Sequence, residues 1–66
     1  MNIYLNGEAR EVPDNCTAAK LVESLGLTGR RIAMEVNLEI LPRSDHDSYI
    51  LKAGDKVEIV HAIGGG

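Results

Sequence analysis

The chain has 66 residues, a formal net charge of −3, two Tyr, no Trp, no Phe and one Cys. A chain of this length forms one small domain, buries only about 60% of the surface that its unfolded form exposes, and leaves little volume for an enclosed active site. We therefore do not expect an enzyme with a pocket of its own. Scattered basic residues and few aromatic ones argue against nucleic-acid binding, and no apolar run approaches the roughly 20 residues of a membrane span.

The N-terminal segment MNIYLNG and the single Cys16 bear on the compartment. The segment lacks the basic stretch and apolar stretch of a secretory signal peptide. A lone cysteine cannot form a disulfide within the chain and is typical of a reducing compartment, so we expect a cytoplasmic protein. We interpret Cys16 as a small apolar residue of the core, the commoner role of a free cysteine, rather than as a sulfur-handling thiol activated by a helix N-terminus.

Residues 1–12 predict a β-hairpin. Apolar and polar positions alternate over residues 1–5, as expected for a strand with one buried face. Asn6–Gly7 is the strongest short signal for a two-residue hairpin turn. Residues 8–12 then form the returning strand, which the segment PDN ends.

A short helix is predicted after the hairpin. Apolar residues recur there at the spacing of one helix face, at Ala18, Leu21, Val22 and Leu25. Thr17 or Asn15 can accept a hydrogen bond from the first turn of this helix. Gly26 follows at the place where helices favour a left-handed residue.

Alternating apolar residues predict the remaining strands. The run over residues 31–43 breaks near Asn37–Leu38 and so gives a long and a short strand. A turn at Gly54–Asp55 leads to a final strand in which Val57 and Ile59 share one face.

One architecture accommodates this order of hairpin, helix, strand, short strand and final strand. One helix on one face of a mixed sheet of four or five strands buries the apolar faces most economically. We therefore predict an α+β fold of the β-grasp (ubiquitin-like) type over residues 1–63, followed by a flexible glycine tail over residues 64–66.

His46 lies between two aspartates in the polar segment SDHDS and raises the question of a metal site. Neighbouring side chains of an extended loop do not converge on one ion, and no zinc-ligand spacing is present. We expect a solvated polar loop here and no metal site. His61, in the final strand, is expected to be a half-buried or surface residue.

The last three residues, Gly64, Gly65 and Gly66, are the only glycines without a turn or helix cap to explain them. An expression remnant is one explanation. The functional alternative uses the terminal carboxylate, which has a pKa of about 3.5 and is ionised at neutral pH. An enzyme can activate this group by coupling it to AMP, and residues without a Cβ pass easily through a narrow channel to the nucleotide.

Three segments, NIYLNGE, EVNLEILPRS and LKAGDKVEIVHAIGGG, resemble the ThiS family of sulfur carriers of thiamine biosynthesis, and the resemblance covers nearly the whole chain. It implies that a ThiF-like, E1-like adenylyltransferase uses ATP and Mg to adenylate the carboxylate of Gly66. A persulfide sulfur donor then yields a thiocarboxylate, which passes sulfur to a ThiG-like thiazole synthase. Gly64 and Gly65 are the implied thread into both active sites. The carrier is a substrate with no catalytic residue and no cofactor of its own; Leu38 and Met34 depart from the family pattern.

Two alternatives remain open at this point. One is a sulfur carrier for another pathway, such as molybdopterin or cysteine synthesis. The other is a non-covalent binding module like the TGS-type β-grasp domains, whose surface rather than its end would be functional. Val60 and Ala62 lie on the opposite face of the final strand from Val57 and Ile59. We expect them to form an exposed apolar surface that contacts a partner.

Overall fold

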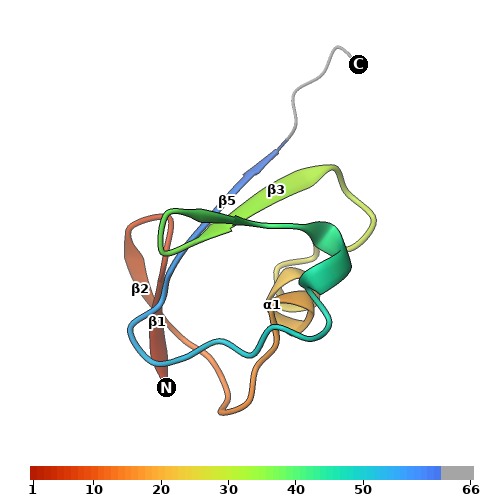
Figure 1. Cartoon of the computed structure of the whole chain (residues 1–66). Coiled ribbons are helices and arrows are strands. Elements are labelled where there is room, and N and C mark those ends of the chain that lie inside the picture. Colours follow the sequence, from red (N-terminus) through yellow and green to blue (C-terminus); the bar gives the residue numbers. More distant parts are fainter. Residues whose placement is uncertain (62–66) are drawn as a thin grey trace.

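The structure is a computed structural model that describes residues 1–61 (Figure 1). Its elements are β1 (Asn2–Leu5), β2 (Glu8–Glu11), α1 (Ala18–Ser24), β3 (Ile32–Val36), β4 (Glu39–Leu41), the 3-10 helix η1 (Arg43–Asp45) and β5 (Lys56–His61). The strands form one sheet in the order β2-β1-β5-β3-β4. The central β5 is parallel to β1 and antiparallel to β3. The predicted helix on a mixed sheet is confirmed, with five strands; the predicted domain boundary after residue 63 lies outside the described residues.

Short-range signals explain the hairpin and the helix. Asn6 and Gly7 have φ angles of 50° and 86°, the left-handed backbone that a two-residue turn between antiparallel strands requires. The hydroxyl of Thr17 accepts a hydrogen bond from the Lys20 amide at 3.1 Å, which satisfies one donor that a first helical turn leaves unpaired. Gly26, with φ 72°, follows the helix. The hairpin, the Thr17 cap and the Gly26 stop are thus confirmed.

The core lies between α1 and one face of the sheet (Figure 1). It consists of Ile3, Val12, Cys16, Ala18, Leu21, Val22, Met34, Val36, Leu51, Val57 and Ile59. Aliphatic side chains supply nearly all of it, as the lack of Trp and Phe requires. The interpretation of Cys16 as a core residue is confirmed, because its side chain is buried.

The expectation of a solvated polar loop is confirmed for Ser44, Asp45, Asp47 and Ser48, which are exposed, but it is wrong for His46 itself. This residue is buried, and its Nε2 lies 3.2 Å from the carbonyl oxygen of Leu41. Its own carbonyl accepts a hydrogen bond from the Ala19 amide at 3.0 Å, and the carbonyl of Tyr49 does the same for Ala18. The first turn of a helix has amides without partners inside the helix. The segment after β4 folds back over α1 and supplies these partners, which buries the imidazole.

Candidate functional site

The face of the sheet opposite α1 carries most of the large apolar side chains that remain exposed. Because Val57 and Ile59 are buried against α1, the alternate residues of β5 point to the other side. The register of the sheet adds neighbours from β1, β3 and β4. We call this surface the open face and define it by Tyr4, Glu35, Ile40, Lys56, Glu58 and Val60.

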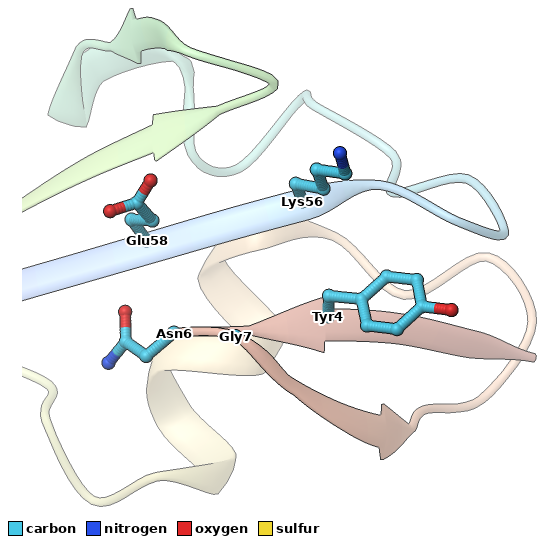
Figure 2. A pocket seen from close by; sticks show the side chains of 5 residues that line it. All are labelled: Tyr4, Asn6, Gly7, Lys56 and Glu58. Atoms are coloured by element: carbon cyan, nitrogen blue, oxygen red, sulfur yellow. The ribbon is translucent and has the colours of Figure 1, made fainter.

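A groove lies at one side of the open face, where β1 ends beside β5 (Figure 2). Its volume is about 480 Å³, and Tyr4, Asn6, Gly7, Lys56 and Glu58 line it. The groove forms because β1 turns away at Asn6 while β5 continues. It is partly open to solvent, so it suits a side chain or loop of a protein partner better than an enclosed small molecule.

The charges on the open face are unbalanced. Glu35 lies directly opposite Glu58 in the β3–β5 register, and like charges in that position repel each other. Lys56, two residues before Glu58 in β5, is the only basic side chain among the six that define this surface. The open face therefore combines exposed apolar groups with a negative centre, which complements a partner surface that is apolar and basic.

Val60 is the predicted partner-surface residue that the structure describes. Its side chain is 59% exposed on the open face, near the end of β5. The predicted exposure is thus confirmed, whereas its contact with a partner stays a prediction. Ala62, Gly64, Gly65 and Gly66 lie outside the described residues. His61, the last residue of β5, is exposed.

Three polar residues that the sequence analysis places in turns also make side-chain hydrogen bonds to β5 or to the residues just before it, and these bonds were not predicted. Asp55, only 5% exposed, accepts hydrogen bonds from the Lys52 amide at 2.8 Å and from Asn37 Nδ2 at 3.1 Å. Asn37 Oδ1 in turn accepts from the Lys56 amide at 2.9 Å. At the other end of the strand, Asn6 bonds to Ile59. Their positions in turns were the available signal, because Asn and Asp there bond to backbone groups.

No three His, Cys, Asp or Glu side chains among residues 1–61 gather closely enough to hold a metal ion. No helix within these residues has the length and apolar character needed to cross a membrane.

A family model and a solved structure of known proteins both match this chain. The sequence model of the ThiS family matches residues 3–66. The crystal structure of a thiamine biosynthesis protein (ThiS) from Geobacter metallireducens has a TM-score of 0.86 and 30% sequence identity to this chain, with 100% of both chains covered.

Two curated relatives differ in length. A thiazole synthase of Paramagnetospirillum magneticum is 42% identical over 66 residues, and the chain spans only 20% of its length. The sulfur carrier protein ThiS of Escherichia coli is 29% identical over 66 residues and is covered along 100% of its length.

Proposed function

The chain belongs to the ThiS family, and we propose that it carries sulfur for thiamine biosynthesis as a thiocarboxylate on Gly66. The observation that supports this most directly is the family match over residues 3–66, which includes Gly64, Gly65 and Gly66. The similarity to the Escherichia coli sulfur carrier over its full length supports the same function. The glycines then serve as the thread that brings the carboxylate to partner active sites.

The proposed chemistry begins with the ionised carboxylate of Gly66. One of its oxygens attacks the α-phosphorus of ATP in a ThiF-like, E1-like enzyme that binds Mg, and pyrophosphate leaves. The terminal sulfur of a persulfide then attacks the acyl carbon, and AMP leaves. A thiol reduces the resulting acyl disulfide and releases the thiocarboxylate. All catalytic groups belong to the partners, so the carrier itself is a substrate.

A thiazole synthase is the proposed acceptor of the sulfur. In the Paramagnetospirillum magneticum relative, a segment 42% identical to this chain forms part of a thiazole synthase. A carrier-like segment and that enzyme thus share one polypeptide, which places donor and acceptor in constant proximity. We propose that this chain meets a ThiG-like thiazole synthase as a partner.

The length of the segment after β5 limits where any such partner touches the domain. Residues 62–66 follow His61, and five residues span at most about 17 Å when fully extended. An enzyme that acts on the carboxylate of Gly66 must therefore reach the domain near the end of β5. Val60 is a large exposed apolar side chain of the open face at that end. We propose that it contacts the partner, together with Ala62.

Mass spectrometry of the intact protein tests the proposed function. After incubation with ATP, Mg, a ThiF-like enzyme and a persulfide donor, replacement of oxygen by sulfur adds about 16 Da. Fragmentation should locate the added mass at Gly66. A variant that lacks Gly65 and Gly66 should keep its circular dichroism spectrum but gain no mass. An unmodified full chain, or full activity of the shortened variant, would contradict the carrier function and favour a non-covalent binding module.

A further inference from the structure

The side chain of Asn6 replaces a missing residue of β1. The last main-chain pair between β1 and β5 is Leu5 with Val57, after which the chain turns back with Asn6 at φ 50°. The main-chain amide of Asn6 still donates to the Val57 carbonyl at 2.8 Å. One residue pair further along, the side chain continues the ladder: Oδ1 accepts from the Ile59 amide at 2.9 Å, and Nδ2 donates to the Ile59 carbonyl at 3.3 Å.

Ile59 is consequently the last residue of β5 that is held from both sides within the described part of the chain. Beyond it, Val60 and His61 pair with Ala33 and Ile32 of β3. Figure 2 shows Asn6 at the end of β1, with its side-chain amide beside β5. The amide thus secures the part of β5 from which residues 62–66 continue.

We infer that Asn6 is a positioning residue for the reaction at Gly66, an inference that rests on the proposed function. Its amide holds Ile59 and so fixes the end of β5, the strand that precedes residues 62–66 in the chain. Without this amide, β5 beyond Val57 is tied to β3 alone and its end frays. The partner enzyme must then order this end when it binds. The conformational entropy lost when the backbone of a single residue is fixed on binding weakens the affinity by about five- to thirtyfold.

Asn37 provides a matched control at the opposite end of β5. It also stands in a two-residue turn with positive φ, 52°, and its Oδ1 accepts from the Lys56 amide at 2.9 Å. In both asparagines Oδ1 thus accepts from an amide of β5, whereas Asn37 Nδ2 donates to Asp55, which lies before the strand. Asn37 acts at the first residue of β5, however, where a disturbance leaves the other end of the strand in place.

The experiment compares Asn6→Gly with Asn37→Gly. Glycine tolerates the positive φ at both positions, so each substitution removes mainly the side-chain bonds. Both variants should lose stability towards urea. For sulfur loading by the ThiF-like enzyme, Asn6→Gly should raise KM about tenfold with kcat nearly unchanged. The reason is that the end of β5 is no longer ordered before the enzyme binds, so the substitution weakens binding and leaves the chemical step as it was. Asn37→Gly should leave both constants near those of the unsubstituted chain.

Amide hydrogen exchange of the free chain gives a second readout that needs no partner. Asn6→Gly should speed exchange at the Val60 amide about tenfold relative to Asn37→Gly, since loss of the tie opens the end of β5 locally. If Asn6→Gly does not fold, Asn6→Asp replaces it. Asp keeps the acceptor for the Ile59 amide and loses the donor, so its effects should be intermediate.

The KM values and the exchange rates together support or overturn the positioning role of Asn6. Equal KM values for the two glycine variants, or equal exchange at Val60, would overturn the positioning role of Asn6. A loss of stability without a change in KM would show that Asn6 acts only in folding. If the unsubstituted chain itself takes up no sulfur, the proposed function fails. The exchange rates then still show whether Asn6 secures the end of β5.

Discussion

Replacing Asp55 by Asn tests whether the polar network before β5 stabilises the fold. The carboxylate is 5% exposed and accepts one hydrogen bond on each oxygen, from the Lys52 amide and from Asn37 Nδ2. Asn has the same shape but offers one acceptor and one donor group. Its NH2 must face one of the two existing donors, so one of them is left without an acceptor.

The expected loss of stability is large for so small a domain. An unsatisfied buried donor costs about 1–3 kcal/mol, and the remaining bond weakens because charge-assisted hydrogen bonds are about twice as strong as neutral ones. We expect the free energy of unfolding to fall by about 2–4 kcal/mol in all. A chain of 66 residues has a total of only about 3–10 kcal/mol, so the variant is close to unfolding.

Urea unfolding followed by far-ultraviolet circular dichroism measures this loss, since the chain has no Trp to report by fluorescence. With a slope of about 1 kcal/mol per molar urea for a small domain, the midpoint should fall by about 2 M or more. Asp47→Asn is the control, because it removes the same charge from an exposed side chain. A difference between the two variants below about 0.5 kcal/mol would refute the role assigned to Asp55.

Two substitutions are expected to stabilise the protein. Leu38 has φ 72° and is 82% exposed. Leu38→Gly should therefore remove left-handed backbone strain of about 1–2 kcal/mol. Part of this gain is offset because glycine raises the conformational entropy of the unfolded chain. A higher urea midpoint than that of Leu38→Ala, which keeps the strain, is the expected result; equal midpoints would contradict it. Glu35→Lys turns the repulsion with Glu58 into attraction, which should add about 0.2–1 kcal/mol. This gain should shrink at high salt, and a salt-independent change would argue against an electrostatic cause.

Much of the fold could be predicted because its signals are local. The turn at Asn6–Gly7, the cap at Thr17 and the stop at Gly26 each depend on residues within a few positions of one another. The prediction for His46 was wrong for the opposite reason. Its polar neighbours indicate a solvated loop, whereas its burial follows from the distant amides of α1 that this segment satisfies. No pattern within the segment itself reports that need.

The candidate site likewise has a part that the sequence predicts and a part that it does not. The glycines at residues 64–66 and the apolar Val60 could be singled out from the sequence, because their meaning depends on residue type and on the alternation of a strand. The negative pair of Glu35 and Glu58 could not, because it exists only once β3 and β5 are paired in their observed register.

The sequence by itself determined where the strands, the turns and the helix lie, which residues alternate, and which glycines no predicted turn or helix cap explains. Only the tertiary structure decided that β5 is the central strand, which face of the sheet stays open, and that Asn6 holds Ile59, a partner 53 positions away in the chain. A strand pattern shows that two faces differ, but the partner on each edge depends on how all segments pack together. Side-chain bonds such as that of Asn6 follow from this packing. No local signal in the sequence predicts them.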